Sequence, residues 1–185
     1  MSDKVAIFID GAYLDKVLQE EFCSPRIDYE KLAKWMAQDI SILRCFYYHC
    51  LPYQGNPPTD EQRERFVRKQ AFFNRIANLS QFDVRLGKLE FRGFKEGGVP
   101  FFIQKRVDIL LGVDLVMLAA KQRITHAAIF TGDSDYLPAI QVAKNEGVIM
   151  MLYHGAANPP HEELWKVMDQ RILLTEDVIQ QMNRA

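Results

Sequence analysis

The chain has 185 residues, of which 48% are apolar and 25% charged, and its formal net charge is −1. This length and apolar content predict a single domain with a substantial core, spanning residues 1–185. The near-neutral balance excludes a protein that is basic overall. Because no apolar run is long enough to cross a bilayer and "MSDKVAIFID" lacks a signal-peptide pattern, we expect a cytoplasmic protein with no membrane partner.

The average charge conceals an uneven distribution. Residues 61–106 contain eleven basic and five acidic side chains, a net charge of +6, so the rest of the chain carries −7. This polarity suits an anionic partner that meets one face, although solvated helix surfaces also accumulate charge. The three cysteines, Cys23, Cys45 and Cys50, are odd in number and lack a metal-ligand spacing, so we expect reduced thiols.

Strand and helix patterns alternate along the first half of the chain. The apolar run "VAIFI" predicts a strand at 5–9, and a helical pattern follows at 13–18. Further along we expect a helix at 29–38 capped by Asp28, a strand at 42–49, a loop at 51–58, a basic helix from a capping box at 59–62 to about 79, and a strand or hairpin at 82–93.

The second half continues this alternation after a flexible loop at 93–100. We expect, in order, a helix at 105–122, a strand at 126–130, a helix at 136–147, a strand at 148–154, a helix at 162–170, a short strand at 171–174 and a terminal helix capped by Thr175. Strands that are apolar on both faces are typical of parallel strands covered by helices. The sequence therefore predicts an α/β fold, a three-layer α/β/α sandwich around a mainly parallel sheet.

Several aspartates stand where such a fold forms its sites. Asp10 ends the first strand, Asp133 follows the strand at 126–130, and Asp135 enters the helix behind it. Ligands bind beyond the carboxyl ends of parallel strands, and these two strands can be neighbours in the sheet. The helix at 105–122 adds Asp108 and Asp114, whose spacing of six does not put both on one helix face.

Each of these acids also has a structural explanation. Asp and Ser side chains cap helix starts, and Asp108 suits a first turn, whereas Asp114 in an apolar helix needs a partner. Clustered carboxylates repel one another unless a cation joins them, and hard oxygen ligands suit Mg²⁺ or Mn²⁺. We favour a metal site, because one topology places five acids at one edge of the sheet. The chain lacks the paired aspartates of haloacid-dehalogenase-type phosphatases, a Walker loop and a nicotinamide-type glycine fingerprint.

Three stretches of the chain carry a resemblance to a known family. In this order, "IFIDGAYL", "QKRVDILLGVD" and "IFTGDSDYLPAI" resemble the NYN domain, specifically its LabA-like (DUF88) branch, within the PIN-like nuclease superfamily. The resemblance covers about residues 4–175, with a terminal helix at 175–185. The chain departs from the family pattern at Tyr13, where asparagine is usual, and at Arg106, where glycine is usual.

The resemblance implies a PIN-like, Rossmannoid fold and a metal-dependent ribonuclease. Asp10, Asp108, Asp133 and Asp135 would be catalytic and, together with Asp114, would bind the Mg²⁺ or Mn²⁺ that activates a water for attack on the phosphodiester. Lys105 matches the family lysine. Residues that we expect to contact the substrate are Lys105, Arg106, Thr131, Ser134, Arg63, Arg65, Arg68 and Arg75.

Other residues of these segments are expected to be structural. We expect Phe66, Phe72 and Phe73 of the basic helix to lie in the core, and the four histidines to be ordinary structural residues. RNA is the expected partner, with a DNA nuclease and a non-catalytic RNA- or protein-binding scaffold as alternatives, because the 2′-hydroxyl has no short sequence signature. The sequence leaves homodimer formation open.

Overall fold

A computed structural model of the protein describes residues 2–98 and 100–183. Its seven-stranded sheet has the order β4-β3-β2-β1-β5-β6-β7. The strands are β1 (Lys4–Asp10), β2 (Ser41–Cys50), β3 (Phe82–Phe94), β4 (Pro100–Lys105), β5 (His126–Phe130), β6 (Ile149–His154) and β7 (Gln170–Leu173). Neighbouring strands pair in parallel, except that β3 and β4 form an antiparallel hairpin.

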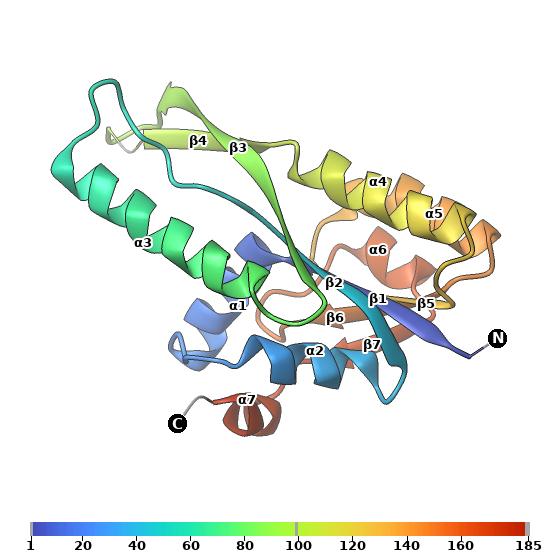
Figure 1. Ribbon diagram of the computed structural model, residues 1–185. Coiled ribbons are helices and arrows are strands. Elements are labelled where there is room, and N and C mark those ends of the chain that lie inside the picture. Colours follow the sequence, from blue (N-terminus) through green and yellow to red (C-terminus); the bar gives the residue numbers. More distant parts are fainter. Residues whose placement is uncertain (1, 99, 184–185) are drawn as a thin grey trace.

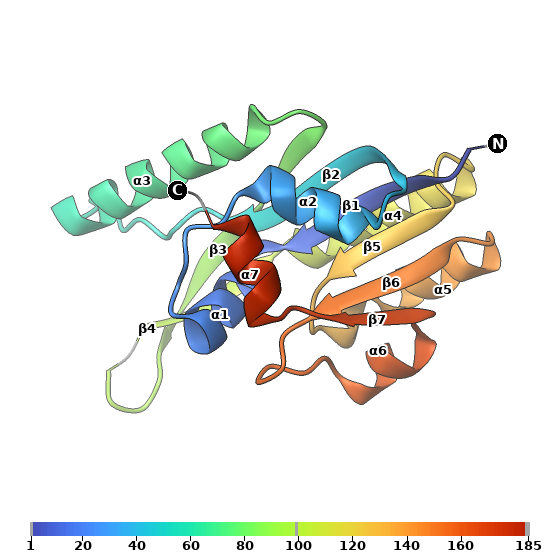
Figure 2. The same ribbon diagram turned by 90° about the horizontal axis from the view of Figure 1, so that it is seen from below.

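Helices cover both faces of the sheet (Figures 1 and 2). One layer holds α1 (Gly11–Phe22), α2 (Tyr29–Ala37), α3 (Asp60–Ala77) and α7 (Glu176–Met182). The other holds α4 (Val107–Ala120), α5 (Leu137–Asn145) and α6 (Glu162–Val167), with a 3₁₀ turn, η1 (Ser134–Tyr136), before α5. The predicted three-layer sandwich is confirmed. Within the described part of the chain, no helix combines the length and hydropathy required to span a membrane.

Strand β1 forms the centre of the molecule. Its residues 5–9 are fully buried and point alternately into the two layers: Val5, Ile7 and Ile9 pack among α1, α2 and α3, and Ala6 and Phe8 pack toward α4 and α5. A strand buried on both faces is what a continuous apolar run predicts in a parallel sheet. The neighbours of β1 are β2 and β5, so the sheet order reverses direction here.

Local sequence signals set several helix starts. The Asp28 carboxylate accepts hydrogen bonds from the backbone N–H groups of Glu30 and Lys31, at 2.9 and 3.2 Å, and starts α2. Thr59 and Gln62 form the reciprocal capping box that the sequence predicts for α3. Thr175 precedes α7 as predicted, but its side chain makes no capping hydrogen bond.

The main departure from the prediction is β4. The sequence predicts a loop up to residue 100 and a helix from 105, whereas residues 100–105 form a strand and α4 begins at Val107. Pairing with β3 stabilises this segment, and Phe91 lies opposite Phe102 with ring centroids 5.6 Å apart. Such cross-strand pairing comes from tertiary structure, which a pattern within residues 101–105 does not reveal.

Candidate active site

The carboxyl ends of β1 and β5 meet at one edge of the sheet. These strands pair in parallel, with Ile9 opposite Phe130, so Asp10 and Thr131 follow at neighbouring positions. The buried Thr131 hydroxyl donates a hydrogen bond to Asp10 Oδ2, at 3.4 Å. This edge is also where the strand order reverses, and open α/β sheets bind ligands at such a point.

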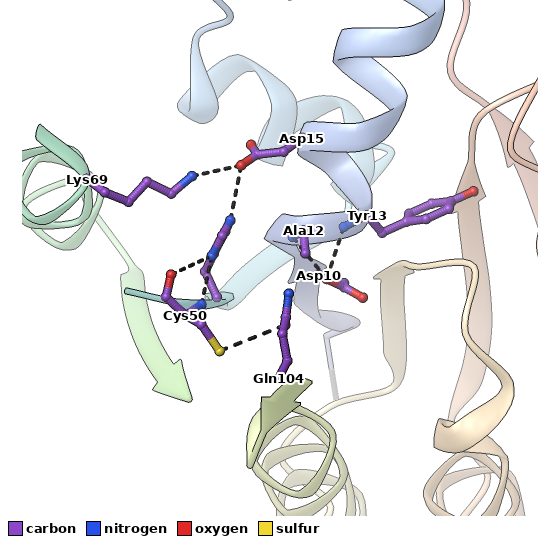
Figure 3. Close-up of polar contacts among 8 residues, drawn as sticks. Asp10, Ala12, Tyr13, Asp15, Cys50, Lys69 and Gln104 are labelled. Carbon is purple, nitrogen blue, oxygen red and sulfur yellow. Dashed lines mark hydrogen bonds and ion pairs between the residues drawn. The ribbon is translucent and has the colours of Figure 1, made fainter. Parts of the chain in front are cut away.

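The two carboxylate oxygens of Asp10 make different contacts at this edge. Its Oδ1 accepts hydrogen bonds from the N–H groups of Ala12 and Tyr13, at 3.1 and 3.2 Å, and thereby caps α1 (Figure 3). Its Oδ2 faces Thr131. The helix cap and the contact with Thr131 therefore use different oxygens of the same carboxylate.

The turn after β5 brings a second carboxylate to this edge. Asp133 donates its backbone N–H to Thr131 Oγ1, at 3.2 Å, and its side chain accepts from the N–H of Asp135, at 3.0 Å, which starts η1. Asp133 is therefore the capping residue, and Ser134 opens the 3₁₀ turn behind it. Asp135 is exposed at the rim of the same turn.

Tyr136 connects the carboxylates of β1, η1 and α4. Its buried hydroxyl donates to Asp108 Oδ1, at 3.2 Å. Burial raises the pKa of Tyr136, and the negative charges of Asp10, Asp108 and Asp133 raise it further. Tyr136 was not among the residues predicted for the site, although it lies within the third family-like stretch, "IFTGDSDYLPAI".

Burial, and to a smaller degree repulsion within this group, raises the pKa of Asp10 and of Asp108. Loss of solvent is the largest effect raising the pKa of Asp10; Asp108 adds to it, whereas the N–H groups of Tyr13 and Ala12 oppose it. Loss of solvent likewise raises the pKa of Asp108, with Asp133 and Asp135 adding to it. None of the ion pairs formed by the described residues involves these four aspartates, which we call the acidic cluster: Asp10, Asp108, Asp133 and Asp135.

The chemistry of the acidic cluster fits a hard divalent cation, because it consists of carboxylates without a cationic partner beside a threonine hydroxyl. The carboxylates are nevertheless farther apart than the ligands of one bound metal ion would be. Across residues 2–98 and 100–183, no three His, Cys, Asp or Glu side chains converge closely enough to hold a metal ion. The cluster therefore has the oxygen ligands that a divalent cation prefers, but its carboxylates do not converge on one point.

Asp114 lies in a different network. Its Oδ2 accepts hydrogen bonds from the Tyr48 hydroxyl and from Arg85 Nε, at 2.9 and 3.1 Å. Arg85 also pairs with Asp83 at 3.0 Å, and its guanidinium lies 5.3 Å from the centre of the Phe46 ring. These contacts connect α4 to β2 and β3 and supply the partner that an acid in an apolar helix needs.

The predicted substrate-binding residues have varied surroundings. Lys105 pairs with Glu90 at 3.1 Å, and the exposed Arg106 precedes α4 in the left-handed backbone region, with φ 76°. On α3, Arg63 pairs with Asp60 and Arg68 with Glu64 across exposed turns. Two others, Arg65 and Arg75, take part in no ion pair among the described residues.

A chain of polar groups connects α3 with this edge of the sheet. His49 Nε2 and Lys69 Nζ both contact Asp15 Oδ2, at 3.0 and 2.7 Å (Figure 3 shows Lys69 and Asp15). Burial opposes ionisation of Asp15, but the hydrogen bond from His49 and the charge of Lys69 together lower its pKa. The charge of His49 also acts on Asp10 and lowers its pKa. His49 is thus a second residue that the sequence analysis underrated; its position at the end of "FYYH", on the strand beside β1, was the available signal.

Tyr13 occupies the position where the family pattern has asparagine. Its hydroxyl donates to the carbonyl of Asn158 and accepts from the N–H of Gly155, so it fastens the loop after β6 to α1. Burial raises the pKa of Tyr13 to about 12, and the phenol therefore stays protonated as a donor. Glu21 supports the same loop by accepting from the backbone N–H groups of Ala156 and Asn158, at 2.8 and 3.1 Å.

Comparisons with known proteins agree with this architecture. A family model described as the NYN domain matches residues 4–174. The crystal structure of a protein of unknown function from Vibrio parahaemolyticus RIMD 2210633 superposes with a TM-score of 0.66, over 95% of each chain, at 16% sequence identity. At that identity the likeness concerns the fold. No curated protein matches the sequence.

Proposed function

The chain belongs to the NYN domain family, part of the PIN-like nuclease superfamily, and from this premise we propose that it is a metal-dependent ribonuclease. The observation that carries the proposal is the acidic cluster, which gathers at the carboxyl edge of β1 and β5 without cationic partners among the described ion pairs. Charge left uncompensated in this way destabilises a protein, so a functional cation is the simplest reason to retain it. The motifs around Asp10, Asp108 and Asp133 further support membership of the LabA-like (DUF88) branch.

The superfamily generally uses divalent metals, and the residues that would hold Mg²⁺ or Mn²⁺ here are Asp10, Asp108, Asp133 and Asp135. When bound, such an ion supplies positive charge and an acidified water for hydrolysis of a phosphodiester. Thr131 orients Asp10 through the hydrogen bond to Oδ2, and Tyr136 orients Asp108. Asp114 we assign to a supporting role, since Arg85 and Tyr48 already engage it.

The test is a cleavage assay with a variant that keeps the fold. Purified wild type and Asp10→Asn are incubated with end-labelled single-stranded RNA, hairpin RNA and matched DNA, each with Mg²⁺, Mn²⁺ or EDTA. We expect the wild type to cut RNA only with a metal and Asp10→Asn to be at least about 100-fold slower. Preference for the DNA substrates would instead identify a DNA nuclease.

One observation favours a second candidate, a protein that binds RNA without cutting it. The acidic carboxylates of the described residues do not converge on a common point, as they would in a preformed metal centre. If no substrate is cut by folded wild-type protein with either metal, yet RNA is retained in a gel-shift assay, this binding function replaces the nuclease.

A further inference from the structure

A groove separate from the acidic cluster lies between α3 and the layer formed by α1 and the start of α2. Two adjoining hollows of about 790 and 510 Å³ form it, and Asp15, Tyr29 and Phe72 line both. We call it the α3 groove. Hollows of this size accommodate groups of small-molecule dimensions, a range that includes a nucleotide.

The walls of the α3 groove are basic, although the chain as a whole is not. Its one acidic lining residue, Asp15, is already engaged by Lys69 and His49. The basic lining residues are Arg26, Arg65, Arg68, Lys69 and Arg75. This surplus of positive charge along a concave surface complements a polyanion.

Aromatic surface lies among these charges. Phe72 is half-buried, so part of its ring remains accessible, and Tyr29 packs edge-on against it with centroids 5.6 Å apart. Lys69 Nζ lies 5.2 Å from the centre of the Phe72 ring. A ring beside cations is the combination with which proteins hold a base and its phosphate. Phe72 was predicted to lie in the core, and it is instead half-buried.

The groove and the acidic cluster both use helix α1. Asp10 caps α1, and Asp15 lies five residues further along that helix, about 7–8 Å at the usual helical rise. Figure 3 shows Lys69 reaching from α3 toward Asp15, with Asp10 at the start of α1.

We propose that the α3 groove binds an unpaired segment of the nucleic acid, with phosphates on Arg65, Arg68 and Arg75 and one base against Phe72. An unpaired strand is required, because the bases of a duplex are stacked on one another and cannot reach an aromatic side chain. That the bound strand is then cut rests on the proposed function; the binding itself does not.

The test measures binding without cleavage, in EDTA. Fluorescence anisotropy follows a labelled 12-nucleotide RNA, the same strand as DNA, and the RNA annealed to its complement. The groove variants are the double substitution Arg65→Gln/Arg68→Gln and, separately, Phe72→Leu, which keeps an apolar side chain in place. The matched control is Lys121→Gln/Arg123→Gln, which removes the same charge from exposed residues beyond the end of α4. Thermal unfolding verifies that each variant is folded.

We expect the RNA strand to bind tighter than the duplex. The double arginine variant should weaken binding roughly 10- to 25-fold at 0.1 M salt and reduce the slope of log affinity against log salt by about 1.4. Phe72→Leu should weaken it about fivefold, the lower end of what one stacked base contributes. The control variant should change it less than about twofold.

Three results would overturn the groove proposal: groove variants that bind like the control, duplex bound as tightly as the single strand, or an acidic peptide that displaces RNA at equal charge concentration. The last would make the groove a protein-binding surface. If binding depends on the groove but no RNA is cut, only the nuclease assignment is wrong. If RNA is cut, and neither cleavage nor binding changes in the groove variants, only the groove proposal is wrong.

Discussion

Tyr13 and Asn158 lie 145 residues apart in the chain, yet the Tyr13 hydroxyl donates a hydrogen bond to the Asn158 carbonyl. The same hydroxyl accepts from the Gly155 N–H, and the Tyr13 ring packs against Phe130 with centroids 5.6 Å apart. The residue that departs from the family pattern therefore joins α1 to the loop after β6.

Removing that hydroxyl should loosen the loop. In Tyr13→Phe the ring packing remains, but Asn158 and Gly155 lose their partner, which costs about 1–1.5 kcal/mol, or roughly 2–6 °C in melting temperature. Hydrogen exchange at residues 155–158 should accelerate more than exchange in β1. An unchanged exchange rate in this loop would mean that Glu21 alone holds it.

Asp10→Asn should stabilise the protein at neutral pH while abolishing cleavage. The folded-state pKa of Asp10 is raised, chiefly by burial, so ionised Asp10 destabilises the fold as pH rises above about 4. Asparagine keeps the helix cap without the charge. We expect the variant to melt about 2–4 °C above wild type at pH 7, if relief is worth ~1 kcal/mol, and the gap to close toward pH 4. Melting curves between pH 4 and pH 7 measure this difference in melting temperature. A variant that is less stable than wild type at pH 7 would contradict the prediction.

Divalent cations should bind the folded wild type measurably, whatever its activity. Mn²⁺ at 100 times its dissociation constant would stabilise the native state by about 2.7 kcal/mol, roughly 5–11 °C. Asp10→Asn should show much less of this rise. Calorimetric titration with Mn²⁺ gives the same comparison without unfolding. Equal Mn²⁺ responses in the two proteins would place the ion elsewhere.

Asp114→Ala should cost stability and leave metal binding intact. The buried Tyr48 hydroxyl and the partly buried Arg85 would both lose an acceptor, at a cost of about 2–4 kcal/mol. Urea unfolding measures that cost, and Mn²⁺ titration of the folded variant measures the site. A variant that unfolds like wild type but no longer binds Mn²⁺ would make Asp114 a ligand.

Two glycine substitutions should have opposite effects. A Cβ on Gly11 would lie 2.6 Å from the buried Tyr47 ring and 2.8 Å from His49 Cδ2, so Gly11→Ala should destabilise the protein by about 1–3 kcal/mol. In α4, a Cβ on Gly112 meets only Ala139, at an ordinary 3.5 Å. Gly112→Ala should therefore stabilise by roughly 0.5–1 kcal/mol through helix propensity. If the two variants have similar free energies of unfolding, the Tyr47 ring must move to accommodate the new Cβ at position 11.

The sequence predicted the fold well because most elements carry their own local signal. The apolar runs of β1 and β5, the cap at Asp28 and the box from Thr59 to Gln62 each lie within a few residues. The sequence allowed β1 and β5 to be neighbours without requiring it, and the structure pairs them in parallel. Strand β4 was missed because its partner supplies its stability.

The site was predicted less completely, for a related reason. Asp10 and Asp133 are marked by the ends of strands, which a sequence displays. The sequence does not display the partners of Asp114, because Arg85 reaches Asp114 from β3 through a tertiary contact. Tyr136 and His49 read as ordinary core residues until the fold places them beside carboxylates.

The hydrogen bond between Thr131 and Asp10 joins residues that are 121 positions apart. At about 5–20 residues per second, a ribosome that has added Asp10 needs on the order of 10 s more to reach Thr131. Throughout that interval the nascent chain carries Asp10 without the strand that completes its surroundings. The acidic cluster can therefore assemble only after β5 and the turn that follows it have left the ribosome, late in the synthesis of the chain.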